Sequence, residues 1–136
     1  MNIIDPELKK KFDQAFQNYK QGNLKNAEIL YKKILDTYPH HLPSLINLAL
    51  MFEQKKKFKE SIKYYKKVII RNSNHIIAHF NLGSIYNNLG EQEEAIKLFK
   101  KVVKINPNFI LAQKNIGMIH MKNFDWEKAE NTFIDV

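Results

Sequence analysis

The sequence predicts an all-α protein, an array of tandem helical hairpins. Two observations support this: residue types recur with a period of 34, and apolar residues inside each period follow helical spacing. Gly and Pro number only four each, too few for a turn-dense β-sandwich. With 136 residues, 44% of them hydrophobic, the chain can form one domain or one short repeat array.

The 34-residue period appears in several independent registers. One register holds small residues, another holds aromatic rings four positions later, and a third holds branched aliphatic residues. Their members are Ala27, Ser61, Ala95 and Ala129, then Tyr31, Tyr65, Phe99 and Phe133, then Ile34, Val68, Val102 and Val136. A fourth register reads Ala15, Ala49, Gly83 and Gly117. We therefore expect every 34-residue unit to have the same structure.

Each unit is expected to hold two helices separated by a short break. Asp5 followed by Pro6 is typical of an N-cap and first helical turn. Gly90 interrupts the third unit, and Asn106 before Pro107 ends its second helix, because proline disfavours helix at the preceding residue. The other breaks are Gly22-Asn23, Lys56-Lys57 and Asn123-Phe124-Asp125. The expected helices are, in chain order, 6–20, 24–37, 43–55, 58–71, 76–88, 92–104, 110–122 and 126–135.

The small residues have a packing role. Ala or Gly in the middle of each first helix is expected to face Ala or Ser early in the second helix, so that the two axes approach closely. Enlarging Gly83 or Ala95 to leucine is expected to overpack the crossing by about 1–3 kcal/mol.

This pattern resembles the tetratricopeptide repeat (TPR), whose signature is W-x2-L-G-x2-Y, then A-x3-F, then P over 34 residues. The third unit fits best, with Leu82, Gly83, Tyr86, Ala95, Phe99 and Pro107. His79 takes its tryptophan position. The resemblance covers residues 8–136 and implies a right-handed superhelix (solenoid) of stacked hairpins whose first helices line a concave groove. It also implies a protein-protein interaction scaffold that binds an extended peptide.

The repeats are expected at 8–41, 42–75, 76–109 and 110–136, the last being incomplete. Repeat arrays normally end in an atypical polar cap, and none follows here. We therefore expect the chain to be a fragment of a longer protein, or its C-terminal end to be covered by another molecule. Self-association through that uncapped end is one form this could take.

A column of polar side chains is expected along the groove, at Asp13, Asn47, Asn81 and Asn115. A carboxamide both donates and accepts, so it can pair with a peptide backbone whatever the peptide's side chains. Helices about 8–10 Å apart match about three residues of extended peptide. The predicted peptide-binding residues are Asn47, Asn81, Asn115, Asp13, Phe12, Phe16, Leu50, Ile77, Phe80 and Asn88. The alternative is composition alone, since 15 of the 136 residues are Asn.

Two branches of the family suggest different partners. Residues 78–96 are similar to repeats of the O-GlcNAc transferase superhelical arm, which has such an asparagine ladder. An alternative function is therefore the substrate-targeting arm of a larger enzyme such as a glycosyltransferase, or a structural subunit of a multiprotein assembly. The positions of the chaperone carboxylate clamp hold Phe12, Phe16, Ile77 and Asn81, so no clamp is expected.

A lysine pattern follows the same period, on the second helix of each hairpin. It comprises Lys32-Lys33, Lys66-Lys67 and Lys100-Lys101, with Lys63 and Lys97 one turn earlier. We interpret it as a solvated outer face whose lysine stems cover apolar surface. The alternative is docking to an acidic partner, a membrane surface or nucleic acid. Nucleic acid is disfavoured, because Arg71 is the one arginine and the stripe is expected to lack aromatic rings.

Catalytic and metal sites are not expected. The chain has no cysteine, which excludes disulfides, thiolate metal sites and cysteine nucleophiles. His75 and His79 are spaced i, i+4 but lack the neighbouring residues of a zinc motif, and His79 occupies a packing position. His40 and His41 are expected in a turn facing solvent. No catalytic constellation is recognisable, so we expect a non-enzymatic protein without cofactors or metal.

Two further sequence patterns bear on where in the cell the protein is expected. No apolar run approaches the roughly 18 residues of a membrane span, and the N-terminus has no secretion signal. We expect a cytoplasmic, intracellular protein whose partner is another protein or peptide.

Overall fold

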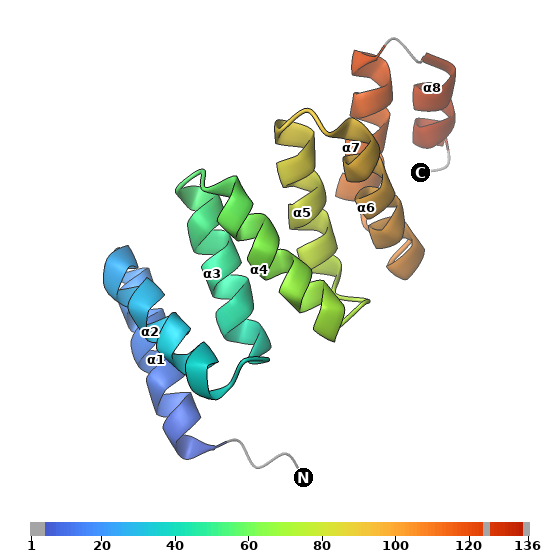
Figure 1. Cartoon of the computed structure of the whole chain (residues 1–136). Coiled ribbons are helices and arrows are strands. Elements are labelled where there is room, and N and C mark those ends of the chain that lie inside the picture. The colour runs from blue at the N-terminus through green and yellow to red at the C-terminus, as the bar shows by residue number, and fades with distance from the viewer. Residues whose placement is uncertain (1–4, 124–125, 135–136) are drawn as a thin grey trace. The chain divides into compact units, whose positions relative to one another are not determined.

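The computed structural model describes residues 5–123 and 126–134 (Figure 1). Over this part of the chain it contains eight helices and no strand. The helices are α1 (Pro6–Lys20), α2 (Leu24–Thr37), α3 (Leu42–Gln54), α4 (Phe58–Arg71), α5 (Ile76–Asn88), α6 (Gln92–Ile105), α7 (Ile110–Lys122) and α8 (Trp126–Ile134). The all-α prediction is confirmed.

Local capping chemistry accounts for the helix ends, and three of the predicted bounds were wrong by one residue. Asp5 is the N-cap of α1 and accepts a hydrogen bond from the Glu7 backbone N–H at 2.9 Å, as predicted. Helix α3 lies one residue earlier than predicted, because His41 is its N-cap and Pro43 lies in its first turn. Helix α6 includes Ile105, because the extended residue before Pro107 is Asn106. Helix α8 is described to Ile134, and position 135 lies outside the described residues.

The break inside each of the first three hairpins uses one left-handed residue. Gly22 has φ 80° and Gly90 has φ 82°, and Lys56, midway between them, has φ 56°. These positions are 34 apart. Glycine tolerates this conformation because it lacks a Cβ, whereas a lysine is strained there. The backbone turn is thus the same in all three hairpins, although only two of them use glycine.

The described chain divides into two compact units, residues 1–71 and 72–136. In the first unit α1 packs on α2, α2 on α3 and α3 on α4 (Figure 1). Its core contains Ala15, Ala27, Tyr31, Ile34, Leu48, Met51 and Phe52. In the second unit α5 packs on α6, α6 on α7 and α7 on α8. Its core contains Ala95, Phe99, Val102, Ala112, Ile116 and Ile119.

The small residues allow close helix crossings, and the structure shows which groups lie nearest to them. In the second hairpin Ser61 Oγ donates to the Ala49 carbonyl at 2.8 Å, so the two small residues meet as expected. In the third, a Cβ added to Gly83 would lie 2.9 Å from Cε1 of Phe99. The glycine therefore leaves room for the aromatic ring of the facing helix. Gly117 accommodates Phe133 in the same way.

Candidate interaction surfaces

In the first unit, aromatic side chains of α1 form a row along one face. The rings of Phe12 and Phe16 stack at 6.2 Å, and those of Phe16 and Tyr19 at 6.3 Å. Phe16 is 37% exposed, and Lys20 Nζ lies 5.0 Å from the centre of its ring. An exposed ring between stacked neighbours is held in place without being covered, which suits an apolar contact with a partner.

Phe12 belongs to the core side of this row. Its half-buried ring lies 5.8 Å from that of Tyr31 and 5.3 Å from that of His41. The same holds in the second unit for Phe80, whose ring lies 5.7 Å from Phe99 and 5.1 Å from Phe109. Of the predicted peptide-binding residues, these two contribute mainly to packing.

Asn47, on α3, is half-buried and oriented by a core tyrosine. Its Nδ2 donates to Tyr31 Oη at 2.9 Å. Tyr31 is fully buried, and this burial raises the pKa of its phenol. One N–H of the carboxamide is therefore used, while the second N–H and the Oδ1 lone pairs have the capacity to bond a ligand. A fixed carboxamide loses less side-chain entropy on binding than a mobile one.

A second amide–tyrosine pair involves the other end of α3. Gln54 Nε2 donates to Tyr19 Oη at 2.9 Å, which joins α3 to α1. Leu50, one turn before Gln54, is half-buried. Sequence reasoning missed Tyr19 and Tyr31 as partners of these amides, because neither pair is separated by the repeat period.

Asp13 differs from the asparagines in its column. It is exposed and forms an ion pair with Lys9 at 2.7 Å, one helical turn away. An exposed i, i+4 pair of this kind contributes only a few tenths of a kcal/mol. Asp13 is thus available at the surface, but as an anion already facing a lysine.

The second unit presents exposed apolar side chains on α5 and α7. Ile77 is 47% exposed, Leu111 56% and Met118 54%. Asn81 and Asn115 are half-buried, and Asn88 is exposed. On α7, Leu111, Asn115 and Met118 share one face by helical spacing. An apolar face with an amide within it is suited to a peptide that presents both side chains and backbone.

The lysine stripe contains aromatic rings, contrary to the prediction. In the first unit the rings of Phe52 and Tyr64 stack at 5.6 Å. Lys32 Nζ lies 5.6 Å from the Phe52 ring centre, and Lys63 and Lys67 lie 6.0 Å and 5.5 Å from that of Tyr64. Such cation–π contacts fix the ammonium groups above an apolar base.

One carboxylate partly neutralises this cluster. Glu28 accepts from Lys32 at 2.8 Å and from Lys55 at 3.1 Å. The hydrogen bond from Lys32 is the main reason that the pKa of Glu28 is lowered.

The histidines serve as caps and packing groups. His75 Nδ1 accepts from the Ala78 backbone N–H at 3.1 Å, and buried His79 lies with its Nδ1 2.9 Å from the His75 carbonyl oxygen. His41 was expected to face solvent, and this was wrong: it is half-buried, and its Nδ1 lies 2.8 Å from Ser44 Oγ. Burial lowers the pKa of His41.

Clusters of metal-ligating side chains and membrane-spanning helices are both absent from the described residues. This part of the chain brings no three His, Cys, Asp or Glu side chains together as a metal site. None of its helices combines the length and apolar composition that a membrane crossing requires.

Family models of the tetratricopeptide repeat match residues 11–41, 42–75 and 76–109. The last two ranges are those that the 34-residue period assigns to the second and third repeats. None of the three models describes a catalytic family. No curated protein sequence matches the chain significantly.

Several solved structures share the fold. A tetratricopeptide repeat protein from Parabacteroides merdae superposes with a TM-score of 0.89 at 21% identity, over 97% of this chain and 53% of that one. MamA AMB-1 gives 0.83 at 22% identity, over 98% and 74%. MamA from Desulfovibrio magneticus RS-1 gives 0.81 at 18% identity, over 93% and 72%. The solenoid fold class is thereby confirmed.

Proposed function

The chain belongs to the tetratricopeptide repeat family, and from that premise we propose a protein-protein interaction scaffold that binds an extended partner segment along the first helices of its repeats. Proteins of this fold typically bind other proteins. In this proposal the repeats at 8–41, 42–75, 76–109 and 110–136 act as one array, and the asparagines at 47, 81 and 115 pair with the partner's backbone.

The bond between Asn47 and Tyr31 is the observation that favours this proposal. A partly buried carboxamide held by a core hydroxyl at 2.9 Å has a defined orientation and remaining hydrogen-bonding capacity. A composition effect alone gives no reason for an asparagine at this partly buried position.

Hydrogen bonds alone do not supply enough affinity. Three bonds at about 1 kcal/mol each are smaller than the roughly 4–15 kcal/mol cost of association. Exposed Phe16, Ile77, Leu111 and Met118 supply the apolar contacts that the proposal needs. We therefore expect a partner segment that alternates apolar side chains with accessible backbone.

The test is a screen of synthetic extended peptides against the whole chain, followed by titration of the best binder. The triple variant Asn47→Ala, Asn81→Ala, Asn115→Ala is expected to weaken binding by tenfold or more, about 1.4 kcal/mol. The matched control replaces the exposed residues Asn26, Asn74 and Asn131 by Ala and is expected to bind as the parent does. Equal affinity of the two triple variants would reject the ladder.

The targeting arm of a larger enzyme is a second candidate. The resemblance of residues 78–96 to O-GlcNAc transferase repeats, expected from the sequence alone, motivates this candidate. A coding sequence that continues past Val136 into a glycosyltransferase domain would support it, and one that continues into a different domain would remove it.

A further inference from the structure

The formal charge of the chain is concentrated in its first unit. Residues 1–71 contain fifteen Lys and Arg against seven Asp and Glu, whereas residues 72–136 contain seven of each. The whole net charge of +8 therefore belongs to the first unit. A surface with this excess attracts anionic partners and raises their rate of encounter.

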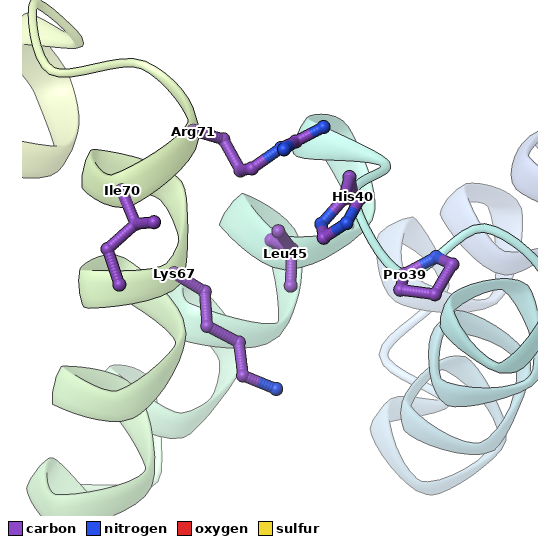
Figure 2. Close-up of a pocket in the computed structure, with 6 residues that line it drawn as sticks. All are labelled: Pro39, His40, Leu45, Lys67, Ile70 and Arg71. Atoms are coloured by element: carbon purple, nitrogen blue, oxygen red, sulfur yellow. The ribbon is translucent and has the colours of Figure 1, made fainter.

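A hollow of about 190 Å³ lies within this unit. It is lined by Pro39, His40, Leu45, Lys67, Ile70 and Arg71. Figure 2 shows Lys67 and Arg71 extending from α4 on either side of Leu45, toward the turn between α2 and α3. Leu45 is buried and Ile70 is 80% exposed. The hollow thus combines apolar walls with two cations at its edge.

A second hollow of about 310 Å³ adjoins the first, since Pro39 and Lys67 line both. Lys32 and Tyr64 line this second hollow, and their side chains belong to the lysine–aromatic cluster described above. The surface therefore continues along α2 and α4, the second helices of the first two hairpins. It is separate from the first-helix residues on which the proposed function rests.

The two cations at the first hollow have no carboxylate partner within the described part of the chain. Among the described residues, the ion pairs join Lys9, Lys11, Lys32, Lys55 and Lys97 to acidic side chains, and neither Lys67 nor Arg71 is in one. The nearby Ile70 is the most exposed of the large hydrophobic side chains in the described residues. Cations that form no ion pair among the described residues, beside an uncovered aliphatic side chain, are complementary to an anionic ligand with an apolar group.

We propose that this surface docks an acidic peptide segment whose carboxylates pair with Lys67 and Arg71 while an aliphatic side chain enters the hollow beside Ile70. The first hollow is smaller than the roughly 300 Å³ at which small-molecule sites begin, which suits one side chain of a longer ligand. The apolar walls contribute affinity, and the cations contribute orientation and rate.

Nucleic acid and anionic membrane fit the surface less well. Asp36 lines the second hollow, Glu28 pairs with Lys32 of that hollow and with Lys55, and Glu60 lies in the first turn of α4. A continuous row of phosphates would meet these carboxylates, whereas a peptide can place uncharged residues opposite them. The unit's sole arginine also gives little of the forked phosphate recognition that arginine provides.

The test uses the whole chain and a fluorescein-labelled synthetic peptide in which pairs of glutamates alternate with single leucines. Fluorescence anisotropy is expected to show binding that weakens with salt. The variant Lys67→Glu, Arg71→Glu is expected to lose about tenfold or more in affinity. The variant Ile70→Ser keeps the charge and is expected to lose about threefold. Replacing the peptide's leucines by glycine is expected to abolish the effect of Ile70→Ser.

The matched control reverses two exposed lysines with the same i, i+4 spacing on α6, Lys100→Glu and Lys104→Glu. It is expected to bind as the parent does, and an equal loss would overturn the site. If the reversed pair at the hollow lowers helicity by circular dichroism, the neutral variant Lys67→Gln, Arg71→Gln replaces it. Displacement of the peptide by an oligothymidylate or by phosphatidylserine vesicles that bind more tightly would overturn the peptide assignment.

Discussion

Asn47 Nδ2 donates to Tyr31 Oη at 2.9 Å and thereby links α3 to the buried centre of α2. The tyrosine is in the core and the asparagine lies at the edge of the surface proposed to bind a peptide. One hydrogen bond therefore serves stability and orients a candidate binding group. The two roles can be separated by replacing each partner in turn.

Tyr31→Phe is expected to lower the free energy of unfolding by about 0.5–1.5 kcal/mol, because it removes one hydrogen bond and leaves a half-buried amide that water can reach. Asn47→Ala is expected to cost about 1–3 kcal/mol, since the buried hydroxyl then lacks a partner. Urea titrations of both variants and of the double variant measure the coupling. Additive losses would show that the bond contributes nothing.

Gly83→Ala is expected to destabilise the protein. Alanine gains about 1 kcal/mol of helix propensity over glycine, but its Cβ would lie 2.9 Å from Phe99 Cε1, and overpacking costs about 1–3 kcal/mol. Thermal unfolding is expected to show a lower midpoint. Adding Phe99→Leu to Gly83→Ala is expected to recover part of the loss, and an unchanged or raised midpoint for Gly83→Ala alone would contradict the packing argument.

Lys56→Gly is expected to stabilise the second hairpin by about 0.5–1 kcal/mol, because Lys56 has φ 56° and glycine adopts that conformation without a Cβ clash. The control is Lys57→Gly, at the next position, where φ is not positive and glycine only adds freedom to the unfolded chain. Chemical denaturation of the two variants is expected to give shifts of opposite sign.

Stability is expected to fall between neutral pH and pH 5. Burial is the main cause that lowers the folded-state pKa of both His41 and His75 below the ordinary value of 6.5. Below pH 6.5 the unfolded chain therefore binds more protons than the folded chain. The stability that the two neutral histidines contribute is complete above pH 6.5 and is lost as pH falls toward their folded-state pKa values.

The check is urea unfolding over this pH range for the parent and for the double variant His41→Asn, His75→Asn. Asparagine suits both positions, because both histidines are N-caps and asparagine is a good N-cap that does not titrate. The double variant is expected to show a shallower dependence. The range stays above that in which Asp5, whose pKa is lowered mainly by the Tyr38 hydrogen bond, begins to contribute. An identical slope in parent and variant would contradict the assignment.

Local patterns in the sequence determined the fold class, most of the helix ends and the family of this protein. Helical periodicity, the 34-residue register and signals such as Asp5-Pro6 and Asn106-Pro107 depend on neighbouring residues, so they can be read before the chain is folded. The repeat also predicted the break at Lys56-Lys57, where no glycine marks it, and the structure shows that Lys56 is the left-handed residue there.

Only the tertiary structure decided which side chains meet across helices. A Cβ on Gly83 would meet the Phe99 ring, Tyr64 lies beneath lysines that were expected to lack aromatic neighbours, and His41 is half-buried. The hollow at Lys67 and Arg71 likewise combines residues from a turn and two helices. The physical reason is that such contacts depend on the angle and offset at which packed helices cross, and no residue spacing along one chain segment encodes these.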